Sequence, residues 1–209
     1  MSNHYVINLG RQLGSGGREI GEKLAKELNI AFYDKELIQL ASEESGLCKE
    51  FFEKADERTQ KTFLGSLFGN RVPFVGDGAI PYGSCLNNDA LFKIQSDVIR
   101  SLAENGSCLF VGRCADYILR DHPRCLNVFI SASKEARIER MMKINGLNAT
   151  QAEELIDKAD RKRAAYYNYY SYNTWGAAAT YHLCIESSVL GIDETVRFIK
   201  EYVIKKFSL

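Results

Sequence analysis

The residues most capable of chemistry lie near the start, where an apolar run (5–9) leads through a glycine-rich turn into an amphipathic segment ending at Leu28. The turn holds four glycines within eight residues, Gly10, Gly14, Gly16 and Gly17. Glycines allow a loop to wrap closely around a phosphate with its backbone N–H groups pointing inward. The helix that follows directs the positive end of its dipole to the same place. The pattern predicts a strand, a phosphate-binding loop and a helix.

The loop departs from the consensus G-x-x-x-x-G-K-[ST] of phosphate-binding loops. Gly17 occupies the lysine position, Arg18 and Glu19 follow it, and Arg11 replaces the first glycine. A cation at a helix N-terminus opposes the dipole unless an anion compensates it, so we expect Arg18 to take the charge role of the missing lysine. The predicted phosphate-binding residues are Gly14, Ser15, Gly16, Gly17, Arg18 and Glu19. The alternative is a tight turn without a ligand, in which Glu19 compensates Arg18.

A second alternative is a dinucleotide site. Gly14 and Gly16 fit the pattern G-x-G-x-x-G, and Asp34 follows the apolar run 30–33 at the distance of the acidic residue that binds ribose. Glu19 stands in the third glycine position, where helix and strand must pack closely. The bulk and charge of Glu19 disfavour this interpretation.

Composition restricts the classes of protein and partner. A chain of 209 residues is long enough to bury one full core, which predicts a single domain over 1–209. The charges balance at 27 basic and 27 acidic residues, so nothing points to nucleic acid or an anionic membrane. The six cysteines are scattered without metal-ligand spacing, which is typical of a reducing compartment. We therefore expect a cytoplasmic protein without a membrane span.

Strand-like and helix-like segments alternate along the chain. The predicted strands cover 5–9, 30–33, 108–111, 126–130 and 181–185. The predicted helices end at 28 or cover 35–44, 46–63, 89–104, 134–145 after a Ser133 cap, 150–170 after a Thr150–Glu153 capping box, and 193–206 after an Asp193 cap. This alternation predicts an α/β fold with a doubly wound, five-stranded parallel sheet. The irregular stretch 65–87 is expected to be a flexible segment.

Ligands of such sheets lie beyond the carboxyl ends of the strands. Asp34 and the stretch from Arg113 to Asp116 follow strands, so we expect them at the same edge as the glycine-rich turn. The planar guanidinium of Arg113 suits a bidentate phosphate contact, although a structural pair with Asp116 is the alternative. Further along, 161–163 is a basic run that either closes over a ligand or forms a solvated face. The tyrosines between 166 and 172 either stack on a base or pack.

Six segments in this order resemble the cytidylate kinase-like family of P-loop proteins, and the resemblance covers nearly the whole chain. The segments are RQLGSGGREIG, FYDKELI, LFVGRCADYIL, VFISASKEARIERM, DKADRKRAAYYNYY and YHLCIESSVLGID. The resemblance implies a P-loop NTPase fold of the nucleoside monophosphate kinase type with a helical lid near 146–175. It also implies transfer of the γ-phosphoryl group of ATP, with Mg²⁺, to a nucleotide such as CMP.

The resemblance assigns roles residue by residue. It places the phosphate loop at 14–19. It implies acceptor contacts at Asp34, Arg113 and Asp116, and it places the flexible segment 65–87 on the acceptor side. Cations near the lid are Arg137, Arg140, Arg161 and Arg163, and we expect Arg18, Arg161 and Arg163 to act in catalysis. Because the usual lysine and the magnesium-binding hydroxyl are missing, a catalytically silent nucleotide-binding or regulatory module is the alternative. No metal ligand and no oligomeric state follow from the sequence.

Overall fold

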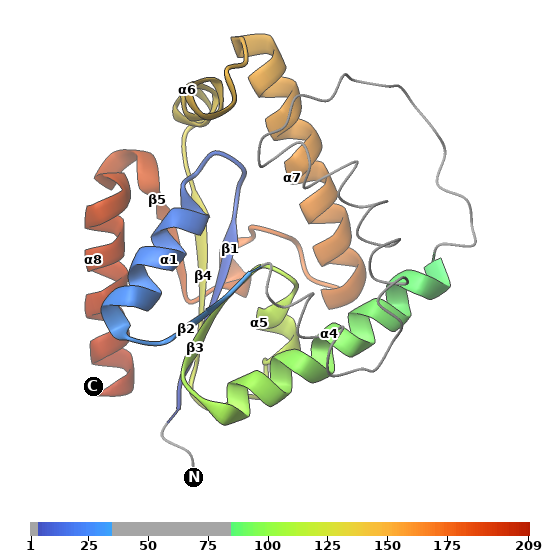
Figure 1. Cartoon of the computed structure of the whole chain (residues 1–209), viewed down its shortest axis with the longest axis vertical. Helices are drawn as coiled ribbons and strands as arrows, with labels where there is room; N and C mark the ends of the chain where they lie inside the picture. The colour runs from blue at the N-terminus through green and yellow to red at the C-terminus, as the bar shows by residue number, and fades with distance from the viewer. Residues whose placement is uncertain (1–3, 35–84) are drawn as a thin grey trace. The chain divides into compact units, whose positions relative to one another are not determined.

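The computed structural model in Figure 1 describes residues 4–34 and 85–209. The chain divides into two compact units, Met1–Asp34 with Ile99–Leu209, and Lys35–Val98. The second unit is described only by the first part of α4 (Cys85–Asn105), which continues into the first unit. The predicted helices at 35–44 and 46–63, and nearly all of the predicted flexible segment 65–87, lie outside the described residues.

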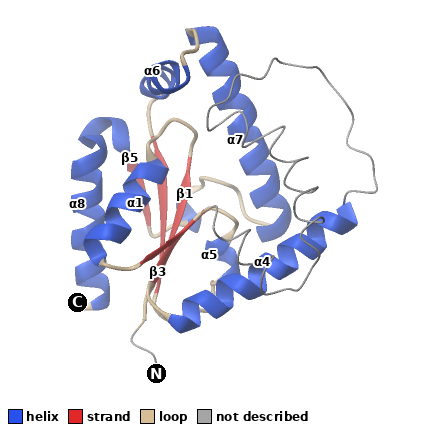
Figure 2. Ribbon diagram, viewed as in Figure 1, coloured by secondary structure: helices blue, strands red, loops and turns tan. Residues whose placement is uncertain are grey.

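The first unit is built on one sheet of five parallel strands in the order β2-β3-β1-β4-β5 (Figure 2). The strands are β1 (Val6–Arg11), β2 (Ala31–Tyr33), β3 (Cys108–Val111), β4 (Cys125–Ser131) and β5 (Leu183–Glu186). The central strand β1 pairs with β3 and β4 such that Val6 lies opposite both Cys108 and Cys125. All five predicted strands and the predicted fold class are confirmed.

Helices cover both faces of this sheet. The helices of the first unit are α1 (Gly17–Leu28), α5 (Ala115–Ile118), α6 (Lys134–Asn145), α7 (Ala149–Ser171) and α8 (Ser187–Phe207), with a 3₁₀ turn at Ala178–Thr180. Figure 1 shows α1 and α8 on one side of the sheet and α7 on the other. The parallel strands need such cover because their backbones are buried on both faces.

The alternation of side chains along β1 separates the core from the site. Ile7 and Leu9 are fully or nearly fully buried and pack in one cluster with α1 and α8. Asn8 and Gly10 lie on the opposite face, because successive side chains of a strand point to opposite sides. Asn8 is only 2% exposed, so β1 carries a buried amide toward the other layer of helices.

Some predicted caps are confirmed and others are wrong. The Ser133 hydroxyl accepts the Ala136 N–H at 3.2 Å, and Gly146 ends α6 with φ 65°. The capping box of α7 is formed by Asn148 and Gln151, not by Thr150 and Glu153. Asn148 accepts the N–H three residues on, so the cap of α7 lies two residues before the predicted Thr150 cap.

The predicted last helix, 193–206, matches the part of α8 that follows Gly191, although Asp193 does not cap it. Helix α8 begins at Ser187, and Gly191 interrupts it with φ 76° and ψ 174°. The Asp193 carboxylate accepts a hydrogen bond from Lys23 of α1 at 2.6 Å. The short helix α5, which follows Cys114, was not predicted, because four residues are too few to show a helical period.

Candidate active site

The glycine-rich turn is tight enough to require its glycines. Gly14 and Gly16 have φ values of 81° and 76°, which residues other than glycine rarely adopt. A Cβ atom on Gly14 would lie 2.9 Å from the Arg137 carbonyl oxygen, and one on Gly16 would collide with Ile192. The glycine pattern therefore reflects backbone conformation and close packing of α6 and α8 as well as access for a ligand.

Side chains from distant elements hold this turn. The Asp160 carboxylate of α7 accepts the Leu13 N–H at 2.8 Å, and Arg137 Nε donates to the Leu13 carbonyl at 2.7 Å. Arg137 and Asp160 also form an ion pair with each other. The Ser187 hydroxyl of α8 donates to the Ser15 carbonyl at 2.6 Å. Arg137, predicted as a lid cation, is thus a buried support of the loop.

Two glycine N–H groups of the turn remain for an anion. The Ser15 hydroxyl is occupied, because it donates to the Gln12 carbonyl at 2.9 Å and accepts the Gly17 N–H at 3.3 Å. Over residues 4–34 and 85–209, the N–H groups of Gly14 and Gly16 have no hydrogen-bond partner. These groups and the N-terminus of α1 are suited to bind phosphate oxygens.

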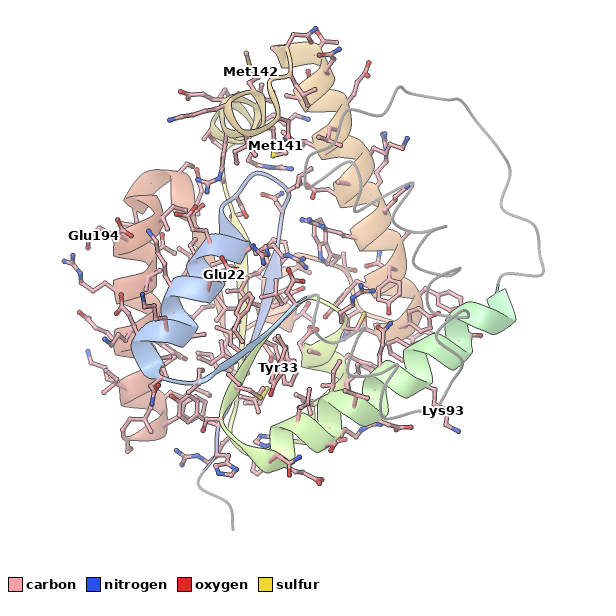
Figure 3. The ribbon with its side chains drawn as sticks, in the orientation of Figure 1. Glu22, Tyr33, Lys93, Met141, Met142 and Glu194 are labelled. Atoms are coloured by element: carbon pink, nitrogen blue, oxygen red, sulfur yellow. The ribbon has the colours of Figure 1, made fainter. Side chains whose placement is uncertain are left out.

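The charged residues that begin α1 are paired. Arg18 Nε donates to Asp34 at 3.0 Å, and Arg18 Nη2 lies 2.9 Å from Glu22, which Figure 3 labels on α1. Glu19 forms ion pairs with Arg140 of α6 and, at 3.4 Å, with Lys23. The anion that compensates Arg18 is therefore supplied by Asp34 and Glu22 rather than by Glu19.

A cavity of about 60 Å³ lies at the end of β1 on the face opposite the α1–α8 core. A single water needs roughly 10–15 Å³ of such volume, so the cavity has room for a group of several heavy atoms. Its polar side chains are Asn8, Arg11, Arg113, Asp116 and Arg163, and its aromatic side chains are Tyr166, Tyr167, Trp175 and Tyr181. The cavity therefore joins residues from β1, the turn after β3, helix α7 and the segment before β5.

Two of the cavity's guanidinium groups are poorly compensated. Burial lowers the pKa of Arg11, and burial together with the neighbouring charge of Arg11 lowers the pKa of Arg163 to about 9. Arg163 donates to the Arg11 carbonyl at 2.9 Å, and its closest carboxylate, Asp160, is 3.8 Å away. Among the described residues, the carboxylate nearest to Arg11 is Asp34, at 3.9 Å. Two partly buried like charges side by side favour binding of an anion between or beside them.

The turn after β3 brings two of the predicted acceptor-binding residues, Arg113 and Asp116, into the cavity. Gly112, Arg113 and Cys114 have φ values of 76°, 58° and 55°, an unusual run of left-handed residues. The Tyr167 hydroxyl donates to Asp116 at 2.6 Å, and burial raises the pKa of Asp116. Arg113 hydrogen bonds to Tyr166. No ion pair joins Arg113 to Asp116 in the part of the chain that the structure describes.

The structure thus brings together most of the predicted site residues. The turn, Asp34, Arg113, Asp116 and Arg163 all lie at one edge of the sheet. Arg161 is exposed on α7 and does not line the cavity. Sequence reasoning missed Asn8 as a site residue, although an amide inside the apolar run 5–9 was a visible signal.

Among the described residues, no three His, Cys, Asp or Glu side chains are grouped as a metal site. Mg²⁺ in kinases is held by one or two carboxylates together with waters and substrate phosphates, so such a group is not required. Beside the turn, the carboxylates of Asp34 and Glu19 both form ion pairs with arginines, Asp34 with Arg18 and Glu19 with Arg140. No helix of the described residues is long and apolar enough to cross a membrane.

Comparison with known proteins agrees with this arrangement. The structure of an uncharacterized protein from Eubacterium ventriosum is similar over 96% of this chain and 98% of that one, with 27% identity and a TM-score of 0.70. The shikimate kinase from Bacteroides thetaiotaomicron is similar in fold over 95% of this chain and 98% of that one, with 14% identity and a TM-score of 0.53.

A second kinase shares the fold. A gluconokinase from Sinorhizobium meliloti gives 11% identity and a TM-score of 0.50, over 100% of this chain and 94% of that one. No curated protein sequence matches the chain. The family model described as the cytidylate kinase-like family matches residues 6–189. This match includes the glycine-rich turn, the cavity and all five strands, and the chain therefore belongs to the cytidylate kinase-like family.

Proposed function

We propose that the protein is an ATP-dependent phosphotransferase that acts on a small anionic acceptor, with a nucleoside monophosphate such as CMP as the first candidate. The observation that carries the proposal is the cavity lined by Arg11, Arg113 and Arg163, which begins where the glycine-rich turn begins. Phosphoryl transfer depends mostly on positioning and on neutralising phosphate charge, so it needs few acid–base groups. Membership of the cytidylate kinase-like family supports the proposal.

In this proposal the turn binds ATP and the cavity binds the acceptor. The N–H groups of Gly14 and Gly16 and the charge of Arg18 would hold the ATP phosphates. Arg113 would bind the acceptor, and Arg163, which reaches both the turn and the cavity, would lie between the two substrates. Mg²⁺ bound to the ATP phosphates would neutralise part of their charge, and Asp34 would supply a protein carboxylate to hold it.

A coupled assay with ATP and Mg²⁺ tests the proposal. The acceptor panel contains the nucleoside monophosphates and, because kinases of shikimate and of gluconate share the fold, these two hydroxy acids as well. We expect ADP formation that depends on one acceptor. A protein that binds nucleotide but turns over no acceptor would overturn the proposal.

That result would favour a catalytically silent nucleotide-binding module. Two observations support this second candidate. Gly17 stands where a catalytic lysine is usual, and the Asp160 carboxylate already occupies the Leu13 N–H of the turn. A bound-nucleotide structure separates the two, because a Mg²⁺ ion that bridges two phosphates would argue for catalysis.

A further inference from the structure

Two polar atoms of the cavity's walls are left without partners. Over the described residues, four buried side-chain nitrogen or oxygen atoms have no hydrogen-bond partner, and two of them, Asn8 Oδ1 and Arg163 Nε, belong to residues that line the cavity. Buried polar groups in native proteins are nearly always satisfied, and an unsatisfied one is costly. One atom is an acceptor and the other is a donor, so a ligand with both kinds of group would satisfy them.

Neighbouring side chains orient the Asn8 amide. Its Nδ2 group donates to Asn127 Oδ1 at 2.9 Å and to the Cys125 sulfur at 3.0 Å. Both N–H bonds of this amide are therefore used, and Oδ1 is the remaining atom. An amide oxygen accepts hydrogen bonds only, so its partner must be a donor such as a hydroxyl group.

Arg163 has an unpaired hydrogen-bond donor, whose partner must be an acceptor. Its Nη1 donates to the Arg11 carbonyl at 2.9 Å, which fixes the guanidinium beside the turn. Its Nε–H is buried and has no acceptor among the described residues. Arg11 lies next to it, so a negatively charged oxygen would satisfy Nε–H and compensate both cations.

We infer that the cavity binds a small anion that also carries a hydroxyl group, and that Asn8 recognises this hydroxyl. The hydroxyl donates to Asn8 Oδ1, an oxygen of the ligand accepts from Arg163 Nε–H, and Arg11 and Arg113 compensate the negative charge. The volume of about 60 Å³ suits a few carbon atoms with one anionic group. The inference rests on the proposed function only where it identifies this ligand as the phosphoryl acceptor.

Calorimetry without ATP tests the inference with three probes, sn-glycerol 3-phosphate, n-propyl phosphate and inorganic phosphate. The first two have the same chain length and charge and differ in their hydroxyl groups. We expect the hydroxylated probe to bind about tenfold more tightly than propyl phosphate, as a hydrogen bond to a buried unpaired acceptor implies. Equal affinities for the two organic phosphates would overturn the inference.

The variant Asn8→Ala should abolish this preference and leave the affinity for inorganic phosphate within about twofold. Asn145→Ala is the matched control, because Asn145 lies at the end of α6 and donates only to the Met141 carbonyl. If Asn8→Ala does not fold, Arg163→Lys takes its place, since lysine keeps the charge but lacks the Nε–H. Arg163→Lys should weaken both organic phosphates by about the same factor, and unchanged binding would contradict the inference.

The test separates this inference from the proposed function. Preference for the hydroxylated probe in a protein without phosphotransferase activity would overturn the proposed function alone. Turnover of an acceptor by a protein whose binding does not distinguish the two organic phosphates would overturn the present inference alone.

Discussion

Arg18 is the residue on which we expect ATP binding to depend most. It lies in the first turn of α1, where a cation is unfavourable, and Asp34 and Glu22 compensate it in the described structure. A charge-assisted contact to phosphate contributes on the order of 1.5–3 kcal/mol. Arg18→Ala should therefore weaken ATP binding roughly ten- to hundredfold, as measured by calorimetry.

Arg197→Ala is the control for this prediction, because Arg197 is exposed on α8 and pairs only with Glu194 at 2.9 Å. Wild-type ATP affinity in Arg18→Ala would mean that the glycine N–H groups or Arg11 hold the nucleotide.

Substitution of Arg113 should weaken acceptor binding and not ATP binding, the opposite of Arg18. It lines the cavity, and Arg18 does not. Arg113→Ala is expected to weaken the acceptor by about tenfold or more and to leave ATP affinity near the wild-type value. Alanine and arginine meet similar strain at a φ of 58°, so the backbone of the turn is little affected. Parallel titrations with ATP and with the acceptor check this, and a joint loss of both affinities would contradict it.

At the scale of elements, the turn between β1 and α1 is held by packing as well as by conformation. Gly14→Ala and Gly146→Ala both place a side chain at positive φ, which costs about 1–2 kcal/mol. Only the Gly14 variant adds a close contact, 2.9 Å from the Arg137 carbonyl, whereas Gly146 has nothing within 4 Å. Gly14→Ala should thus lower the free energy of unfolding by about 1–3 kcal/mol more than Gly146→Ala in urea titrations. Equal losses would mean that α6 moves away at no cost.

The segment 146–175, which contains α7, remains the predicted lid. Lys134, at the start of α6, forms ion pairs with Asp157 and, at 3.4 Å, with Glu153 of α7, so α7 is joined to the first turn of α6. Closure of a lid excludes water from the reacting phosphates. Backbone hydrogen exchange over 146–148 and 172–175 should therefore slow when ATP and acceptor are both present. The α8 C-terminus serves as the internal reference, and unchanged exchange at the lid would contradict the prediction.

For the whole molecule, Asp116 links stability to pH. Burial raises its pKa, so above the usual carboxyl pKa of about 3.9 the unfolded chain loses its proton first. The folded state then binds more protons, and the free energy of unfolding falls as the pH rises through the interval between the two pKa values. Asp116→Asn removes this titration and keeps an acceptor for the Tyr167 hydroxyl.

The variant should gain stability relative to wild type as the pH rises above the usual carboxyl pKa of about 3.9, as measured by urea unfolding at each pH. Asp121→Asn is the control, because the Asp121 side chain is 90% exposed. Wild-type and Asp116→Asn profiles that stay parallel would show that burial does not shift this carboxyl.

The sequence by itself determined the fold, because the fold depends on local periodicity. Short apolar runs alternating with amphipathic segments predicted all five strands, α1, α6 and α7. The position of Asp34 and of 113–116 directly after strands predicted that they share one edge of the sheet. Helix caps were less predictable. Asn148 and Thr150 are both good cap residues, and in the structure Asn148 caps α7.

The hydrogen bonds and ion pairs that hold the site together follow only from the tertiary structure. The Leu13 N–H donates to Asp160, which lies 147 residues further along the chain. Arg137 is a buried residue that supports the turn through the Leu13 carbonyl, rather than an exposed cation. Asn8 gained its role only because Asn127 and Cys125 use both of its N–H bonds. Such contacts depend on which side chains packing brings within about 3 Å, and no local pattern of residues encodes that distance.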